Sequence, residues 1–136
     1  MVALYGLPII FSVVMVATLP APLSDTLLLK LRQSDGATCG SHQYNNEDIS
    51  NALNAGCNYL DEDETVGNDD YYNDYEGFDF STSSPWYEFP ILADHDIFDG
   101  STSPGADRVI FNGNCQFTAV IMHTGASNDD FNECDF

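Results

Sequence analysis

The segment that decides the fold is RVIFNGNCQFTAVIMH, residues 108–123. Two runs in it, Arg108 to Phe111 and Cys115 to His123, are rich in aromatic and β-branched residues, which is typical of strands. Between them stands Asn112-Gly113, a strong signal for a tight hairpin. The segment therefore predicts two neighbouring antiparallel strands.

Further strands and one helix are predicted upstream of this hairpin. Tyr75 to Phe80 and Trp86 to Leu92 have the same strand-like composition and are separated by Gly, Ser, Pro and Asp clusters. The apolar face of the helix follows helical spacing, and it consists of Ile49, Leu53, Gly56, Cys57 and Leu60. Asn45 is its expected N-cap, with Asp48 three residues on, and its end is expected between Leu60 and Asp63. The whole predicts an α+β domain, with one amphipathic helix packed on a twisted antiparallel sheet.

The N-terminal part of the chain differs in character from this domain. Val2 to Leu19 is almost continuously apolar and ends at Pro20-Ala21-Pro22, which predicts a secretory signal peptide over residues 1–21. An uncleaved membrane anchor is the alternative, because the stretch is long and lacks basic residues before it. Residues 22–32 are expected to be a pro-segment, with Lys30-Leu31-Arg32 as its processing site, and residues 33–136 a single secreted, extracellular domain without membrane contact.

The charge balance narrows the range of partners. The 136 residues carry 22 Asp and Glu against 3 Lys and Arg, a formal net charge of −19. Phosphate binding is normally driven by Lys and Arg that displace counterions, so this balance argues against an electrostatically bound DNA or RNA partner. A nucleic-acid enzyme that holds its substrate by other means is still compatible with it. Removal of residues 1–32 would leave Arg108 as the only strong cation.

Four cysteines, Cys39, Cys57, Cys115 and Cys134, fall in the predicted domain. An even number in a small secreted chain predicts two disulfides, for which three pairings are possible. None has CxxC spacing, so no zinc site is expected. The acidic run Asp61 to Glu64 fails the calcium-loop pattern because Val66 stands where that loop needs glycine. No metal or cofactor is predicted.

Three polar residues interrupt the predicted strands at positions where apolar residues are expected. They are Glu88, Arg108 and His123, each from a different strand. Taken singly, each has a structural explanation: a solvent-facing carboxylate, an ion-pair partner and a strand-end histidine. On successive antiparallel strands, however, such side chains can converge on one sheet face. A base, an acid and a fixed cation are the groups that metal-free phosphoryl transfer requires.

Several ordered blocks of the chain resemble the small secreted guanyl-specific ribonucleases of fungi. The blocks are ETVG (64–67), YEGFDFS (75–81), SSPWYEFPIL (83–92), SPGADRV (103–109) and HTGAS (123–127). The resemblance runs from about Thr38 to Cys134 and implies the microbial ribonuclease fold, acting as a monomer on single-stranded RNA or guanine nucleotides and not on DNA. It also implies which cysteines pair: Cys39 with Cys134, and Cys57 with Cys115.

The resemblance assigns roles to the catalytic candidates. Glu88 is implied to be the general base for the 2′-hydroxyl and His123 the general acid for the leaving 5′-oxygen. Arg108 would neutralise charge on phosphorus, Tyr71 would contact the phosphate, and Phe131 would form an apolar wall beside it. The product would be a 2′,3′-cyclic phosphate, later hydrolysed to a 3′-phosphate.

The same resemblance places guanine recognition on residues 72–76. Glu76 is implied to accept hydrogen bonds from N1–H and the exocyclic amine of guanine. Tyr72 and Tyr75 would sandwich the ring, since stacking on aromatic side chains contributes about 1 to 3 kcal/mol per base. Backbone groups near Asn73 and Asp129 would complete the pocket, in which Asp74 stands where the family usually has Asn.

One family feature is missing. The segment after Gly67 is Asn68-Asp69-Asp70-Tyr71, shorter than in the family, and it lacks the histidine that assists the catalytic carboxylate. If Asp69 or Asp70 filled that space, a like charge would raise the pKa of Glu88. The sequence therefore predicts a guanyl-preferring endoribonuclease of reduced activity. Its alternative is a catalytically weakened or inactive secreted ribonuclease-like binding protein or effector.

Overall fold

The structure, a computed structural model, describes residues 36–127 and 130–136. The predicted signal peptide and pro-segment, and with them the alternative of a membrane anchor, lie outside the described residues. The elements in chain order are β1 (Ala37–Cys39), β2 (His42–Tyr44), α2 (Asn46–Glu62), β3 (Asn73–Tyr75), β4 (Trp86–Pro90), β5 (Asp107–Asn112), β6 (Phe117–Met122) and β7 (Asn132–Glu133). Within the described ranges, no helix has both the length and the apolar character needed to span a bilayer.

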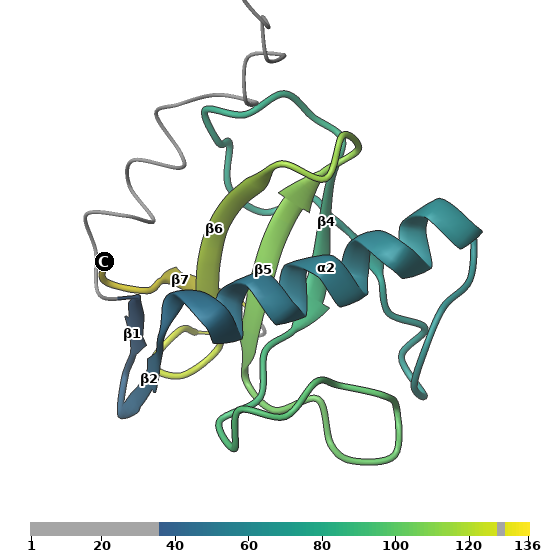
Figure 1. Ribbon diagram of the computed structural model, residues 1–136. Helices are drawn as coiled ribbons and strands as arrows, with labels where there is room; N and C mark the ends of the chain where they lie inside the picture. Colours follow the sequence, from purple (N-terminus) through teal and green to yellow (C-terminus); the bar gives the residue numbers. More distant parts are fainter. Residues whose placement is uncertain (1–35, 128–129) are drawn as a thin grey trace, which may run out of the picture.

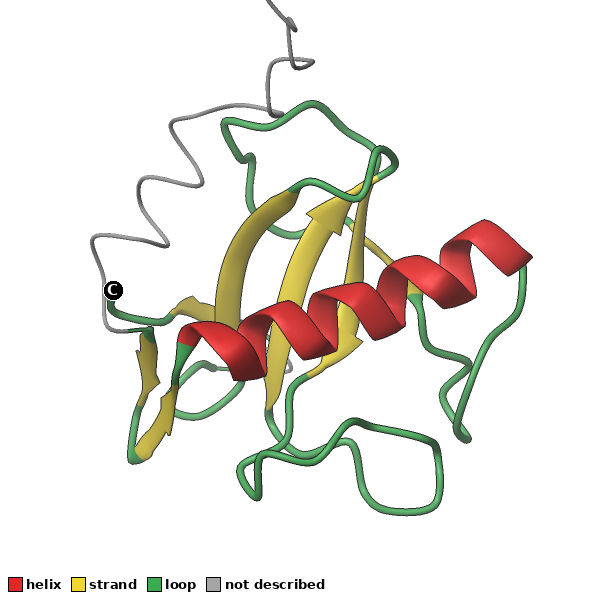
Figure 2. Cartoon of the chain, viewed as in Figure 1, coloured by secondary structure: helices red, strands yellow, loops and turns green. Residues whose placement is uncertain are grey.

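The strands form two antiparallel sheets. One is the β1–β2 pair, and the other has five strands in the order β3-β4-β5-β6-β7. Figure 1 shows α2 lying across one face of β4, β5 and β6, and Figure 2 shows the same arrangement as one helix over a curved sheet. The predicted α+β fold, with one helix on an antiparallel sheet, is confirmed.

Helix α2 begins and ends where its sequence indicates. The Asn45 side chain accepts hydrogen bonds from the backbone N–H groups of Glu47 and Asp48, and the Asp48 side chain accepts from the backbone of Asn45. This reciprocal capping box satisfies N–H groups that the first turn would otherwise leave unpaired. At the other end, Asp63 takes a left-handed conformation and closes the helix.

The two faces of the large sheet carry separate apolar clusters. The larger cluster lies between α2 and the sheet and includes Ile49, Phe89 and Val109. The smaller one occupies the opposite face and contains Tyr75, Ile110, Ala119 and Ile121, with Phe78, Phe80, Trp86 and Phe131 packed against it. Because side chains alternate along a strand, neighbouring residues of β5 belong to different clusters. The face away from α2 is therefore partly apolar and available for a site.

One predicted strand is wrong, and one pair of strands was not predicted. The predicted strand over Tyr75 to Phe80 is wrong, because β3 covers Asn73–Tyr75 and the chain turns away afterwards. At Gly77 a side chain would collide with the Tyr75 hydroxyl, and the backbone N–H of Phe78 donates to that hydroxyl over 3.2 Å. The chain thus wraps around the Tyr75 ring instead of extending. The β1–β2 pair before the helix was not predicted.

The hairpin between β5 and β6 is confirmed, but its loop has one residue more than a two-residue Asn-Gly turn. The backbone N–H of Asn112 donates to the carbonyl of Gln116, and that of Cys115 donates to the carbonyl of Asn112. Cys115 has a φ of 55°. A turn followed by one left-handed residue is the usual three-residue hairpin loop.

One of the two predicted disulfides is present. Cys39 and Cys134 are joined, as the resemblance implies. The prediction for Cys57 and Cys115 is wrong, since both are free cysteines. Their side chains do meet, but as thiols joined by a hydrogen bond, and burial raises the pKa of the Cys57 thiol.

Candidate active site

Glu88, Arg108 and His123 lie on the sheet face that points away from α2. Glu88 on β4 is the cross-strand partner of Ile110, and Arg108 on β5 is the partner of Ile121. His123 follows Ile121 by two residues and so has the same parity. The carboxylate of Glu88 interacts electrostatically with both Arg108 and His123. The structure thus brings together the three side chains that the sequence singles out.

Arg108 is held in place by hydrogen bonds from its Nη groups to four oxygens. It is 4% exposed, and its Nη1 donates to the carbonyls of Pro104, Gly105 and Asp107 over 3.3, 3.0 and 2.8 Å. Its Nη2 donates to the Tyr71 hydroxyl over 2.8 Å, and its Nε is buried without a hydrogen-bond partner. The guanidinium is therefore fixed before any substrate arrives, and its Nε–H is left without a partner.

Glu88 is a half-buried carboxylate, and its surroundings shift its pKa in opposite directions. Burial raises the pKa of Glu88 above its usual range, whereas the charges of Arg108 and His123 and a hydrogen bond from the Asn73 side chain lower it. Its Oε2 atom is buried and has no hydrogen-bond partner. This desolvated, unsatisfied oxygen fits the raised pKa, because burial without a hydrogen bond disfavours the ionised carboxylate.

Asp69 and Asp70, in the shortened segment, do not raise the pKa of Glu88 as the sequence suggested. Asp69 and Asp70 are both exposed. Neither is among the groups that shift the pKa of Glu88, and Asp70 instead faces the Thr65 hydroxyl at 3.5 Å. Burial, not a neighbouring acid, is the cause of the raised pKa.

His123 is oriented by the segment that leads into β7. Its Nδ1 lies 2.8 Å from the backbone carbonyl oxygen of Asp130, and a ring nitrogen that faces a carbonyl must carry the proton. Phe131 stacks on the imidazole with the ring centroids 3.7 Å apart. The other ring nitrogen, Nε2, is then the one free to exchange a proton with a substrate.

Tyr71 reaches the site despite the shortened segment. Val66 and Tyr71 exchange two backbone hydrogen bonds, which close the intervening residues into a compact loop. The Tyr71 ring packs edge-on against Phe98 and lies under Arg108, with the guanidinium carbon 5.0 Å from the ring centroid. Tyr71 therefore contacts the cation that would meet the phosphate.

The two tyrosines predicted to sandwich guanine lie with different apolar clusters in this structure. Tyr75 is buried and contacts Phe131 edge-on at 5.7 Å, on the Glu88 face. Tyr72 lies on the helix side, edge-on to Tyr87 at 5.2 Å. Asp74 and Glu76 are exposed, and Asp129 lies outside the described residues. The two tyrosines do not face each other, so the sandwich and the role of Glu76 stay predictions.

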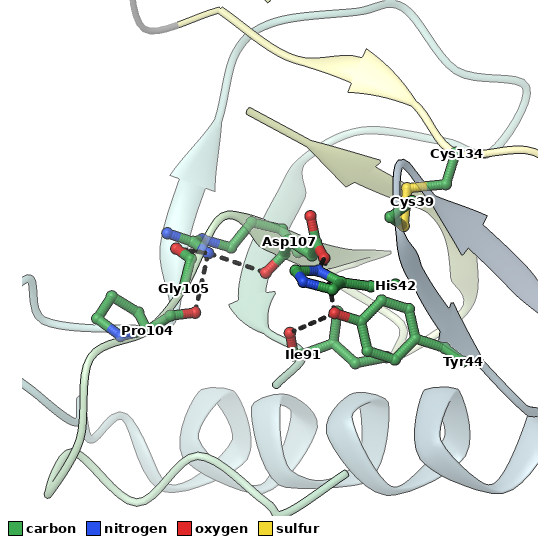
Figure 3. Close-up of polar contacts among 9 residues, drawn as sticks. Cys39, His42, Tyr44, Ile91, Pro104, Gly105, Asp107 and Cys134 are labelled. Atoms are coloured by element: carbon green, nitrogen blue, oxygen red, sulfur yellow. Dashed lines mark hydrogen bonds and ion pairs between the residues drawn. A yellow bond between two sulfur atoms is a disulfide. The ribbon is translucent and has the colours of Figure 1, made fainter. Parts of the chain in front are cut away.

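Asp107, a buried carboxylate next to Arg108 in sequence, hydrogen-bonds two side chains of β2. Asp107 is 1% exposed, and one of its oxygens, Oδ2, lies 2.6 Å from the Tyr44 hydroxyl and 2.8 Å from His42 Nδ1 (Figure 3). The backbone carbonyl of the same residue accepts from Arg108. Sequence reasoning missed this cluster, because His42 stands in a short segment without a recognisable pattern.

A cavity on another part of the described structure lies away from these side chains. It has a volume of about 1170 Å³ and is bordered by the β1–β2 pair, the β6–β7 edge and the C-terminal residues. None of Glu88, Arg108 or His123 lines it. The site is therefore identified by its side-chain chemistry and not by a deep pocket.

The comparisons with known proteins place the chain in a ribonuclease family. The ribonuclease family model matches residues 32–135. Guanyl-specific ribonuclease T1 of Aspergillus oryzae is 49% identical over 120 residues, which cover 86% of this chain and 92% of the relative. Extracellular guanyl-specific ribonuclease Fl1 of Gibberella baccata is 46% identical, over 74% of this chain and 96% of that one. Among solved structures, the ribonuclease from Hericium erinaceus matches with a TM-score of 0.56 and 30% identity, over 74% of this chain and 99% of its own.

Proposed function

Because this chain belongs to the family of fungal guanyl-specific ribonucleases and is an endoribonuclease, we propose that it cleaves single-stranded RNA on the 3′ side of guanosine without a metal ion. The observation that carries the proposal is the meeting of Glu88, Arg108 and His123 on one sheet face. These are the base, the cation and the acid that phosphoryl transfer to an internal hydroxyl needs.

In the proposed reaction Glu88 accepts one proton and His123 donates another. The ionised carboxylate of Glu88 takes the proton of the ribose 2′-hydroxyl, and the 2′-oxygen attacks the adjacent phosphorus. His123 gives its Nε2 proton to the 5′-oxygen as the bond from phosphorus to that oxygen breaks. The products are a 2′,3′-cyclic phosphate and a free 5′-hydroxyl. Hydrolysis to the 3′-phosphate then runs the same proton transfers in reverse, with water in place of the 5′-hydroxyl.

Arg108 supplies fixed positive charge during this transfer. Its guanidinium is already oriented by three carbonyl oxygens and the Tyr71 hydroxyl, so little reorganisation is needed when negative charge develops on the phosphate oxygens. Phe131, stacked on His123, limits the access of water to the imidazole. Both features favour a charged transition state in a partly dry site.

Guanine selectivity belongs to the same proposal. Glu76 is exposed on the segment that follows β3 and is free to accept hydrogen bonds from N1–H and the exocyclic amine of guanine. Tyr75 lies beside Phe131 but is buried, so its ring would have to be uncovered before a base could stack on it. Tyr72 would have to leave its contact with Tyr87 to complete a sandwich around the base.

Secretion supports the choice of substrate. The apolar segment 1–21 has the character of a signal peptide, and a relative at 46% identity is named as extracellular. The Cys39–Cys134 disulfide is also typical of oxidising compartments. We propose a secreted, monomeric enzyme that acts on RNA outside the cell.

The test uses the chain from residue 33 onward with the dinucleotides GpC and ApC in the presence of a chelator. Expected products are guanosine 2′,3′-cyclic phosphate and free cytidine from GpC, with much slower cleavage of ApC. The matched control is the double variant Glu88→Ala/His123→Ala. Lack of product above that control would overturn the proposal, and equal cleavage of the two dinucleotides would overturn the guanine preference alone.

The second candidate function is a ribonuclease-like binding protein with little or no turnover. Two observations favour it: the assisting histidine is missing from the segment before Tyr71, and burial raises the pKa of the base. In this case guanosine 3′-phosphate binds, detected by calorimetry, while GpC is not cleaved. Cleavage at a rate far above the double variant decides against it.

A further inference from the structure

Asn73 lies directly across from the general base. In the pairing of β3 with β4, Asn73 and Glu88 are cross-strand partners, so their side chains leave the same sheet face about 5 Å apart. From this cross-strand position the Asn73 side chain lowers the pKa of Glu88 as a hydrogen-bond donor to the carboxylate. An asparagine amide is the only part of this side chain that can donate, and an ionised carboxylate can only accept.

Among the described residues, Asn73 is the one side chain whose effect on Glu88 is that of a hydrogen-bond donor. Arg108 and His123 also lower the pKa of Glu88, but through their charge. The Nη groups of Arg108 are used by three carbonyls and the Tyr71 hydroxyl. The hydrogen bond that acts on the carboxylate therefore comes from β3.

We infer that the Asn73 side chain is a positioning residue for Glu88, which holds the carboxylate in place where this chain lacks the family's assisting histidine. The inference rests on the proposed function, in which Glu88 is the general base. It assigns a role to the Asn73 side chain that is separate from any backbone contact of this residue with guanine.

The chemistry of an amide differs from that of an imidazole in a way that can be measured. An amide donates to the ionised carboxylate and favours its charged form, but it does not itself titrate near neutral pH. The acid limb of the pH profile of kcat/KM is then set by Glu88, and its position reports the strength of the Asn73 contact.

The experiment compares the wild-type chain with Asn73→Ala and Asn73→Asp. The first variant removes the donor, and the second is nearly isosteric but places a like charge against Glu88. The matched control is Asn58→Ala, at an exposed asparagine of α2, which packs on the opposite face of the sheet from Glu88. The two readouts are the NMR titration of the Glu88 carboxyl carbon, assigned with Glu88→Gln, and the pH profile of kcat/KM for GpC.

Both readouts should move in the same direction. The pKa of Glu88 is expected to rise in Asn73→Ala and to rise further in Asn73→Asp, with no change in Asn58→Ala. The acid limb moves by the same amount, so below it activity falls about tenfold for each pH unit of the shift. The KM for GpC should stay close to the wild-type value, because the backbone of residue 73 is unchanged.

An unchanged pKa of Glu88 in folded Asn73→Ala would overturn the inference, and so would a loss that appears only in KM. The NMR titration needs no turnover. If the wild-type chain failed to cleave GpC while the titration still shifted in the variants, the proposed function would fail and the contact would stand. If the wild-type chain cleaved GpC but the Glu88 titration did not shift in the variants, the proposed function would stand and the role of Asn73 would fail.

Discussion

Glu88 illustrates how burial and charge compete at a single carboxylate. Burial raises its pKa, and two positively charged neighbours and one amide oppose that effect without cancelling it. In the proposed reaction Glu88 must be ionised before it can accept a proton, so its raised pKa would cost activity at low pH. It also makes the carboxylate a stronger base once it is ionised.

The raised pKa of Glu88 predicts a pH-dependent stability. In the folded state the group binds its proton more tightly than in the unfolded chain, so the folded state loses stability as pH rises through the folded pKa. Glu88→Gln removes that loss. We expect the variant to unfold at higher urea concentration than the wild type at about pH 7, with a difference that shrinks toward about pH 4.

Urea titrations at both pH values measure this difference. Glu64→Gln, at an exposed carboxylate, serves as the control and should show no comparable dependence on pH. A Glu88→Gln variant that is less stable than the wild type at neutral pH would contradict the prediction.

At the scale of residues, the sequence predicts the side chains proposed to react but not the groups that hold them in position. Glu88, Arg108 and His123 stand out because polar residues interrupt apolar strands. The amide of Asn73 does not, since its contact with Glu88 depends on the register of a strand whose predicted start was two residues late. The carbonyl of Asp130 carries no side-chain signal, so its hydrogen bond with His123 appears only in three dimensions.

At the scale of elements, the contact between α2 and the sheet depends on a helical glycine. A Cβ atom on Gly56 would lie 2.8 Å from Cε1 of Phe111 and 2.9 Å from Cβ of Phe89. The helix therefore lies closer to β4 and β5 than a side chain would allow. Position 56 is thus fixed by packing and not by helix propensity.

We expect Gly56→Ala to destabilise the protein. Alanine favours the helix by about 1 kcal/mol over glycine, but overpacking of a tight core typically costs about 1 to 3 kcal/mol. The net loss of unfolding free energy should be about 1 kcal/mol. Chemical denaturation measures it, with Asn54→Ala on the exposed side of α2 as the control. A variant as stable as the wild type would show that the helix can shift outward at no cost.

Elements differ in how well local sequence predicts them. Helix α2 was predicted with its caps because the capping box and the apolar spacing are local. The β1–β2 pair was missed because three-residue strands show hardly any alternation, and it is held by distant contacts such as Asp107 with His42 and Tyr44. The strand predicted over Tyr75 to Phe80 was wrong because its aromatic residues form a cluster around one ring.

At the scale of the whole molecule, net charge governs how substrate approaches. With a formal charge of −19, the surface repels RNA at long range, and salt screens that repulsion. We expect cleavage of an oligonucleotide with a single guanosine to stay constant or to increase as NaCl rises from about 20 to 300 mM. Initial rates measure the effect, and thermal unfolding at each concentration controls for stability. A steep fall would indicate binding through phosphate neutralisation.

The Cys39–Cys134 disulfide closes a loop of 95 residues in sequence separation. In the chain-entropy model, a loop of this length stabilises the folded state by roughly 4 to 5 kcal/mol. Cys39→Ser/Cys134→Ser should lose about that much unfolding free energy in a urea titration. Cys115→Ser, at a free cysteine, is the control. If the double variant lost no more than this control, the loop would already be constrained in the unfolded chain.

The same disulfide is reinforced by its neighbours, because Thr38 and Asp135 exchange two backbone hydrogen bonds of 2.7 and 3.0 Å. Residues 36 and 136 therefore lie close enough for a short glycine linker to join them. A circularly permuted gene that begins at Thr102, in the exposed turn after Gly100, would retain every residue of the candidate site. Such a permutant should refold and cleave GpC at the parental rate, and its failure to fold would show that the chain must be continuous through this turn.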